Sequence, residues 1–266
     1  MKQPLFSCVI PVKGERPFFG EAIDSLKAQG MGEDLEIIIQ DGTTEYTEYT
    51  ENDLREVRWY REEDSGQSDA LNKGFAKAKG DWFFWLNADD VLLPGALKKI
   101  LDRINKIDGI NWIAGNQLLI DDACKVLKCS VGNGWHDWLY RHAVPHVYGP
   151  SSFFRRELFE RVGGLDVSLK YCMDWDLWIK FMKAGARFVR VDDYLWGFRQ
   201  WAGSKTQHEK SREEIRNHDL ELQRMLDKND FRITRFGTTT LRVWRLADGS
   251  YLRGWIDTML MRGRTL

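Results

Sequence analysis

Hydrophobic residues in the first 110 positions form short runs, which alternate with stretches where apolar residues recur every three or four positions. Short apolar runs bounded by Gly, Asn or Asp are typical of buried strands, and the longer spacing is typical of helices. Their alternation predicts an α/β fold with a mostly parallel central sheet and helices on both faces. The expected strands are 6–11, 35–40, 57–61 and 82–86, and the expected helices are 17–28, 68–79 and 94–107.

Beyond residue 110 this regular alternation ends. Two apolar runs flank Asp121 and Asp122, which predicts an antiparallel pair with a turn at the two acids. No change in composition marks a linker, so we expect one domain over 1–206 and a helical C-terminal extension over 207–266. The elements expected here are strands 112–120, 125–130 and 187–191 and helices 155–162, 175–184 and 209–228.

Two carboxylates, Asp89 and Asp90, follow directly after the apolar run 82–86. Ligands of open α/β sheets bind just past the carboxyl ends of the strands. Unpaired charges are costly to bury, so this acidic pair is a poor core element. Paired oxygen ligands suit a divalent cation that carries a phosphate ester. The alternative is an ordinary solvated turn, since Asn and Asp are common turn residues.

A second acidic pair, Asp174 and Asp176, lies at the head of the expected helix 175–184. Side chains two positions apart on a helix point in different directions, so at most one of them is expected to face a given site. One suits the first turn of the helix, where acids are favoured. The other suits the role of a general base.

Composition and charge narrow the class of protein. Hydrophobic residues make up 43% and charged residues 30%, which is ordinary for a soluble globular protein, and the net charge of −1 argues against a nucleic-acid binder. Four scattered cysteines without metal-binding spacing favour free thiols in a reducing compartment. The N-terminal residues lack the apolar stretch of a signal peptide, and no run approaches the ~20 residues of a membrane span. We therefore expect a cytoplasmic protein.

The ends of the first two strands carry weaker signals. No glycine-rich loop follows Pro11 and Val12, which argues against a dinucleotide fold and against a P-loop. Asp41 ends the second strand and suits either a hydrogen bond to a base or ribose, or a plain Asp–Gly turn. The polar stretch 61–74 precedes a helix, whose free N–H groups can bind anions, and Asp69 also fits an N-cap.

These motifs together resemble the family 2 glycosyltransferases, over about residues 5–206. The resemblance implies the GT-A fold, a Rossmann-like sheet with a nucleotide-sugar donor half (1–110) and an acceptor half (111–206), and inversion at the sugar carbon. Six segments in the same order carry it: 8–12, 37–42, 63–74, 85–90 with 94–97, 153–159 with 162–164, and 173–178.

The resemblance also implies roles for individual residues. Residues 87–90 would form the metal-binding DXD-like element, with Asn87 in the first acidic position. Asp89 is our first choice as ligand of Mn or Mg, with Asp90 next to it. Asp174 matches the catalytic base, and Met173 replaces the usual preceding Glu. The residues expected around the nucleotide are Pro11, Val12, Asp41, Asp69, Asn87 and Arg199.

The sequence departs from the family pattern at Trp201, which stands where many members have a metal-binding His. Metal ligation is then sparser and relies on phosphate oxygens and water, or His142 or His146 substitutes. Arg199 and Lys205 are expected to assist departure of the diphosphate. The Gln-x-x-Arg-Trp motif of processive synthases is absent, which favours transfer of a single sugar.

The expected function is therefore metal-dependent transfer of one sugar from a nucleotide-sugar to a hydroxyl of a saccharide or lipid-linked saccharide, in synthesis of bacterial surface polysaccharide or lipopolysaccharide. UDP is the favoured nucleotide, with GDP and dTDP open. Three alternatives stay open: a polyprenyl-phosphate sugar transferase, a sugar-1-phosphate nucleotidyltransferase, and a pseudo-transferase that only binds nucleotide or glycan.

The C-terminal extension is basic, with seven Arg and two Asp from residue 231 onward. Arginines interleaved with Trp244, Tyr251 and Trp255 suit an anionic membrane surface, here the inner face of the cytoplasmic membrane. The alternative is a helical extension that packs on the catalytic domain or forms a homo-oligomer contact. The sequence does not decide between them.

Overall fold

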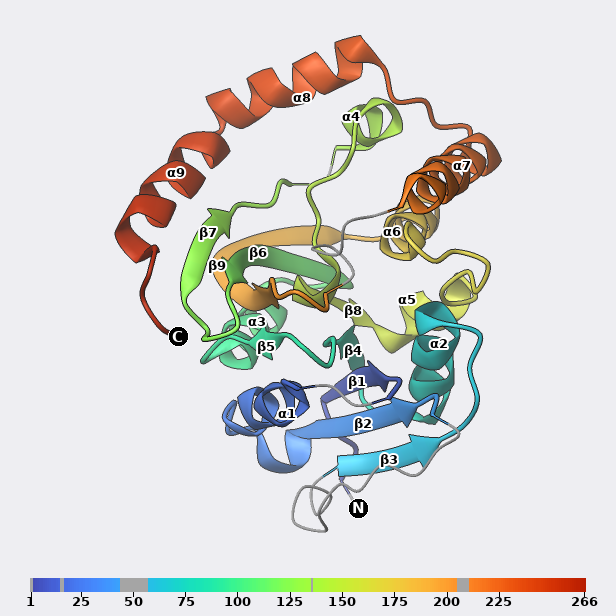
Figure 1. Ribbon diagram of the computed structural model, residues 1–266, viewed down its shortest axis with the longest axis vertical. Helices are drawn as coiled ribbons and strands as arrows, with labels where there is room; N and C mark the ends of the chain where they lie inside the picture. The colour runs from blue at the N-terminus through green and yellow to red at the C-terminus, as the bar shows by residue number, and fades with distance from the viewer. Residues whose placement is uncertain (1, 15–16, 44–56, 135, 205–210) are drawn as a thin grey trace.

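The computed structural model describes residues 2–14, 17–43, 57–134, 136–204 and 211–266. Nine strands of these residues form one sheet in the order β3-β2-β1-β4-β8-β6-β9-β5, with β7 paired to β6 (Figure 1). The first four strands along the chain are parallel to one another, as the sequence predicts. They are β1 (Phe6–Val12), β2 (Leu35–Asp41), β3 (Val57–Arg61) and β4 (Trp82–Trp85).

Alternation along β1 explains why helices cover both faces of this half. Phe6, Cys8 and Ile10 pack in one core with α1 (Phe19–Lys27) and α3 (Ala96–Lys106). Val9 points to the opposite core, which α2 (Gln67–Lys77) covers. Successive strand side chains point to opposite faces, so an apolar residue at every position requires a helix on each side.

The second half of the sheet is mixed. The predicted antiparallel pair is confirmed as β6 (Trp112–Ile120) and β7 (Val126–Ser130). β8 (Ser152–Arg155) lies between β4 and β6 and is antiparallel to both. β9 (Phe188–Arg199) pairs in parallel with β6 and antiparallel with β5 (Val91–Leu92).

Two strands were not predicted, and a third was predicted too short. β5 has only two residues, and β8 has four and leads directly into a helix. Neither is long enough to show the alternation of apolar and polar residues that predicts a strand. The predicted strand 187–191 continues to Arg199. Asp192 and Asp193 interrupt its apolar pattern where its register against β6 shifts, and the pairing with β6 resumes at Tyr194.

The helices expected at 155–162, 175–184 and 209–228 are present as α5, α6 and α7, whereas α4 was not predicted. α6 packs under the sheet beside α5, and α7 lies against α6. α8 contacts α4, and α9 contacts β7, so the extension wraps around the rest of the molecule (Figure 1). Their bounds are α4 Asp137–His142, α5 Arg156–Arg161, α6 Met173–Lys183, α7 Arg212–Asn229, α8 Arg235–Ala247 and α9 Ser250–Met261, with single 3-10 turns at Gly32–Asp34 and Gly149–Ser151.

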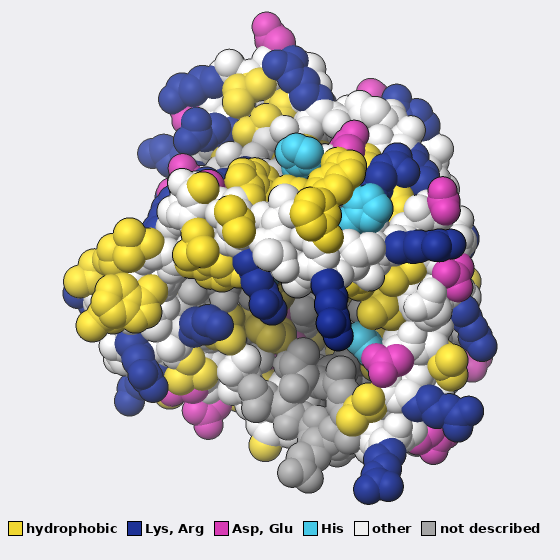
Figure 2. Space-filling model, turned by 90° about the horizontal axis from the view of Figure 1, so that it is seen from above, with side chains coloured by type: hydrophobic (Ala, Val, Ile, Leu, Met, Phe, Trp, Pro, Cys, Tyr) yellow, Lys and Arg dark blue, Asp and Glu magenta, His cyan; other side chains and the backbone are white. Residues whose placement is uncertain are grey.

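Seen from above, apolar side chains gather at the edge of the molecule formed by α9 (Figure 2). Within the described residues, no helix has both the length and the apolar character needed to cross a bilayer.

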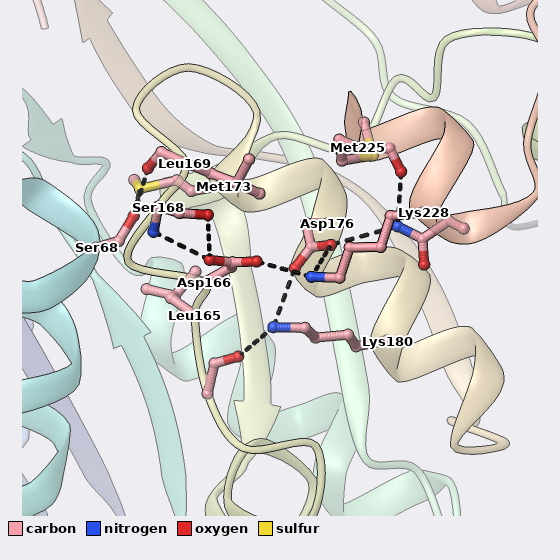
Figure 3. A network of polar contacts seen from close by, with 12 residues as sticks. Ser68, Leu165, Asp166, Ser168, Leu169, Met173, Asp176, Lys180, Met225 and Lys228 are labelled. Carbon is pink, nitrogen blue, oxygen red and sulfur yellow. Dashed lines mark hydrogen bonds and ion pairs between the residues drawn. The ribbon is translucent and has the colours of Figure 1, made fainter. Parts of the chain in front are cut away.

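A polar network joins α7 to α6 (Figure 3). Asp176 is fully buried and forms an ion pair with Lys180 at 3.0 Å, while Asn229 of α7 donates a hydrogen bond to its other oxygen. Lys228 of α7 bonds to Asp166 at 2.7 Å. Although burial opposes it, the hydrogen bonds from Lys228 and Ser168 hold the pKa of Asp166 well below its usual range. The extension is therefore attached to the sheet domain through polar and charged groups as well as through apolar contacts of α7 with α6 and of α8 with α4.

Aromatic rings fill the core between β4, β6 and α6. Trp178 of α6 stacks on Trp85 at 5.9 Å and on Trp112 at 4.9 Å, and all three are fully buried. A Cβ on Gly149 would lie 2.7 Å from Trp85, so the backbone also closes tightly on this stack.

Replacing Trp178 by Ala should lower the free energy of unfolding by about 3–5 kcal/mol, because the cavity left in this stack cannot collapse between two rigid indoles. Urea denaturation measures the change. Trp138→Ala is the matched control, since Trp138 is 43% exposed and should lose far less. Equal losses in the two variants would contradict the role of Trp178 in the core.

Candidate functional site

Two adjoining cavities, each of about 690 Å³, open at the carboxyl ends of β1 and β4. The β1 cavity is lined by the end of β1, the start of α2, residues 87–89 and the loop 167–170. The α6 cavity is lined by Asp174, residues 145–150 and the first turns of α6 and α7. The residues that line both cavities are Gln67, Asn87, Lys170, Gly203 and Ser204.

In the turn after β4, the side chain of Asp89 faces the β1 cavity and the side chain of Asp90 is buried. Asp90 is fully buried, and its oxygens accept the Arg199 backbone N–H at 2.8 Å and the Asn87 amide at 2.7 Å. Burial, together with the nearby Asp89 carboxylate, raises the pKa of Asp90 well above its usual range. Asp90 lines neither cavity, so the structure places it beneath the turn as a support for Asn87.

Asp89 lines the β1 cavity and is half-buried there. Its Oδ2 accepts the indole N–H of Trp201 at 3.0 Å. Trp201 packs edge-on against Phe18 with ring centroids 5.4 Å apart, which fixes the direction of that N–H. The residue that stands in the place of a metal-binding His therefore holds the carboxylate expected to bind the metal.

Arg199 is fully buried and its guanidinium is saturated by other groups. It donates to the backbone carbonyls of Asp89 and Asp122 at 2.8 Å each and to Glu21 at 2.6 Å, and it lies 4.2 Å from the ring of Phe18. It lines neither cavity, so the structure does not bring it to the nucleotide position. Lys205, its expected companion, lies outside the described residues.

The β1 cavity gathers some of the expected nucleotide residues. Pro11 and Val12 line it, and so does the start of α2. α2 begins after Gly66, whose φ of 141° suits only glycine, and no side chain caps it, so its positive end faces the cavity. Asp69 does not line the cavity. Its carboxylate accepts the Ser65 N–H at 2.9 Å and so fixes the loop that leads into α2.

Asp41 does not reach either cavity. It is fully buried, and its oxygens bind Arg61 at 3.0 Å and the Thr43 N–H at 2.8 Å. The sequence could not distinguish a ligand from this internal pairing, because the partner, Arg61, comes twenty residues later from β3.

Asp174 lies on the wall of the α6 cavity, in the first turn of α6. Burial raises its pKa to about 6. The hydrogen bond that it accepts from the Trp175 N–H at 2.8 Å has the opposite, smaller effect on the pKa. A carboxylate with a pKa just below neutral pH suits general-base chemistry. Asp176 points away toward α7, which separates the two acids as the sequence predicts (Figure 3).

Glu221 of α7 fixes the chain just before this acid. Its carboxylate accepts three successive backbone N–H groups, of Lys170 at 2.9 Å, Tyr171 at 2.6 Å and Cys172 at 2.8 Å. The residues before α6 lack a side-chain cap of their own, so Glu221 supplies one from the extension. Nothing in the polar pattern of 209–228 distinguishes Glu221 from its solvated neighbours.

The donor groups fit a divalent cation only with help from a ligand. Among the described residues, no three His, Cys, Asp or Glu side chains gather closely enough to hold a metal ion. His142 and His146 do not line the β1 cavity, and burial lowers the pKa of His146 to about 4. Of the described residues, Asp64 and Asp89 line the β1 cavity with carboxylates, and Asp64 accepts the Gly66 N–H at 3.0 Å. With Asp89 as ligand, diphosphate oxygens would complete the coordination.

Sequence reasoning also missed Gln67, Lys170 and His218. Lys170 lines both cavities, and its Nζ lies 5.4 Å from the ring of Tyr171. Gln67 donates to Asn87 at 2.9 Å, and His218 of α7 lines the α6 cavity. Lys170 lies just before the segment 173–178 of the family resemblance, whereas His218 comes from the extension and gave no signal.

Comparisons with known proteins agree with this geometry. Residues 7–115 match the sequence profile of Glycosyl transferase family 2. An uncharacterized glycosyltransferase of Rickettsia prowazekii is 31% identical over 192 residues, which are 69% of this chain and 60% of the relative. The PGL/p-HBAD biosynthesis glycosyltransferase of Mycobacterium tuberculosis is 24% identical over 71% of this chain and 74% of its own. The chain thus spans under two thirds of the Rickettsia relative.

Two solved structures share the fold. Staphylococcus aureus TarS 1–349 in complex with UDP-GlcNAc superposes with a TM-score of 0.61 at 16% identity, covering 82% of this chain and 66% of that one. Mannosyltransferase PcManGT from Pyrobaculum calidifontis, in complex with GDP-Man and Mn²⁺, gives 0.56 at 18% identity, covering 78% and 59%. The sheet and its flanking helices therefore define a GT-A fold, as expected. By sequence, the chain is similar to glycosyl transferase family 2 over residues 7–115.

Glu221→Ala should lower the free energy of unfolding by about 1–3 kcal/mol and reduce kcat for sugar transfer more than it raises the donor KM. The three N–H groups lose their acceptor, and the turn that carries Asp174 loosens, whereas the parts of the β1 cavity formed by β1 and α2 have no hydrogen bond to Glu221. Chemical denaturation and steady-state kinetics measure the two effects. Glu213→Ala, on the same helix with an exposed side chain that lines neither cavity, is the control. An unchanged kcat in Glu221→Ala would show that α7 does not position the base.

Proposed function

We propose that the protein transfers one sugar from a nucleoside-diphosphate sugar, UDP-sugar favoured, to a hydroxyl of a saccharide or lipid-linked saccharide, with inversion, in bacterial cell-surface glycan synthesis on the cytoplasmic side of the membrane. One observation carries the proposal: Asp89 and Asp174 line two cavities that meet at Asn87. The bound UDP-GlcNAc and GDP-Man named for the two structural relatives support a nucleotide-sugar as donor.

The β1 cavity is the proposed donor site. Its floor, at Pro11 and Val12, is apolar and suits a base, and the uncapped start of α2 suits the diphosphate. Lys13 and Lys170 line the same cavity, so we assign to Lys170 the neutralising role that the sequence suggested for Arg199. Arg199 instead positions Asp89 by holding its carbonyl.

A Mn or Mg ion fits this site if the diphosphate of the donor supplies further ligands. Asp89 would hold the ion, and Asn87 and Asp90 would support the turn that carries it. When bound, the ion supplies Lewis-acid neutralisation of the negative charge on the leaving nucleoside diphosphate. The Mn²⁺ named for the mannosyltransferase structure supports this assignment.

The α6 cavity is the proposed acceptor site. Asp174 accepts the proton of the acceptor hydroxyl as that oxygen attacks the anomeric carbon from the face opposite the leaving group. The carbon–oxygen bond to the diphosphate breaks in the same step, which inverts the configuration. Trp85, Tyr148 and Trp196 line this cavity and offer apolar surface to sugar rings.

Asp174→Asn should reduce turnover by about 10²–10⁴-fold, because the amide cannot accept the proton. In the wild type, kcat/KM should fall about tenfold per pH unit below the Asp174 pKa of about 6.

Burial raises this pKa above that of the unfolded chain, so ionisation of Asp174 above about 6 destabilises the fold. Asp174→Asn should therefore raise the unfolding midpoint at pH 7.

Asp176→Asn is the matched comparison for this variant. It should lower stability, because it weakens the buried pair with Lys180, and reduce the turnover of the folded enzyme far less than Asp174→Asn does. Near-normal turnover in Asp174→Asn, or the reverse assignment of the two effects, would remove Asp174 from the role of base.

A nucleoside diphosphate at a hundredfold its Kd should raise the thermal midpoint by about 5–10 °C by mass action. A panel of UDP, GDP, dTDP and CDP, each with and without Mn²⁺, identifies the base. Asp89→Asn should abolish the Mn²⁺-dependent part of the shift, whereas Asp102→Asn, an exposed acid on α3, should not. A full Mn²⁺-dependent shift in Asp89→Asn would overturn the metal assignment.

A further inference from the structure

The helix α9 is docked with its apolar face turned outward. Its exposed side chains form two neighbouring rows along the helix, and every one of them is apolar; Trp255 is 61% exposed and Met259 is 66% exposed. A helix on the surface of a globular protein normally turns this face to the core. The exposed residues are Tyr251, Leu252, Trp255, Ile256, Met259 and Leu260.

The inward face of α9 is polar and already has partners. Thr258 accepts the backbone N–H of Cys129 of β7 at 2.9 Å, and Asp257 accepts the hydroxyl of Tyr194 at 2.6 Å. Arg253 pairs with Asp192 at 3.0 Å. These contacts fix the rotation of the helix, so α9 cannot turn its apolar rows inward without losing them.

α8 extends the same apolar surface and adds positive charge. Phe236, Val243 and Leu246 are each more than half exposed. Arg235 and Arg242 are exposed on α8, and two further arginines, 262 and 264, follow α9. In residues 231–266 the one fully exposed acid is Asp248, at the turn between the two helices. Figure 2 shows the apolar edge over α9 with Lys and Arg side chains beside it.

The charges decide which partner fits this surface. In a two-fold dimer the same patch faces itself, so these arginines would approach arginines with almost no acid to pair with them. An anionic lipid surface offers what the patch lacks: phosphates for the arginines and an apolar layer for the exposed rows. Trp and Tyr, at 255 and 251, are the side chains favoured at the boundary between headgroups and acyl chains.

We propose that the outward faces of α8 and α9 form a docking surface for an anionic lipid bilayer, with both helices lying parallel to the membrane plane. The apolar rows of α9 enter the headgroup region, and the arginines contact lipid phosphates. The proposal does not depend on the sugar-transfer function, but it would bring the two cavities to a surface where lipid-linked acceptors reside.

Flotation of the full chain with vesicles tests the proposal. The chain should float with vesicles of phosphatidylcholine and phosphatidylglycerol, float less with phosphatidylcholine alone, and be released partly by high salt. The triple variant Leu252→Gln, Trp255→Gln, Met259→Gln should lower the partition coefficient by at least about tenfold. Arg235→Gln with Arg242→Gln should reduce the preference for the anionic lipid.

The matched control is Ile215→Gln with Leu220→Gln, which removes two exposed apolar side chains of α7 and should float like the wild type. Circular dichroism melts show whether each variant remains folded. Absence of wild-type flotation with anionic vesicles, or unchanged flotation of the folded α9 variant, would overturn the proposal. A wild-type dimer that this variant converts to monomer, with no flotation of either, would assign the surface to a second copy.

Discussion

The buried carboxylate of Asp90 is the constraint on which the candidate site depends. It receives the backbone N–H of Arg199 from β9 and the amide of Asn87 from its own turn, so it connects the two halves of the sheet at one point. Arg199, fixed in this way, reaches back to the Asp89 carbonyl and across to Glu21 of α1. The cavity-lining position of Asp89 follows from an interior pair of charged residues, neither of which lines either cavity.

The position of Asp174 also depends on α7, which lies outside the sheet domain. Asn229 of α7 bonds to Asp176 and Lys183 of α6, and Glu221 of α7 caps the residues before α6. Polar links of this kind hold a specific geometry, because each hydrogen bond requires one direction, whereas an apolar contact tolerates sliding. The wall of the α6 cavity is thus positioned by α7, which the sequence predicted only as a polar helix of the C-terminal extension.

The sequence predicted the order and type of nearly all elements in the parallel half, because the apolar runs of β1, β2 and β4 are buried, mostly on both faces. It also predicted where Asp89 and Asp174 lie, since a strand end and a helix start are visible in local patterns. It could not rank Asp89 above Asp90 by exposure, or recognise that Asp41 and Arg199 are internally paired. Those distinctions depend on partners from distant strands, such as Arg61 for Asp41 and Glu21 for Arg199.

The cap that Glu221 places before α6 also affects the order in which the two cavities form during synthesis of the chain. Chains emerge from the ribosome from the N-terminus, and early segments fold first. Among the described residues, those that line the β1 cavity all precede residue 205, whereas the turn that carries Asp174 is held by a carboxylate made almost fifty residues later. A nascent chain can therefore form the first cavity before the second is complete, and it acquires its acid in working position only when α7 has been synthesised.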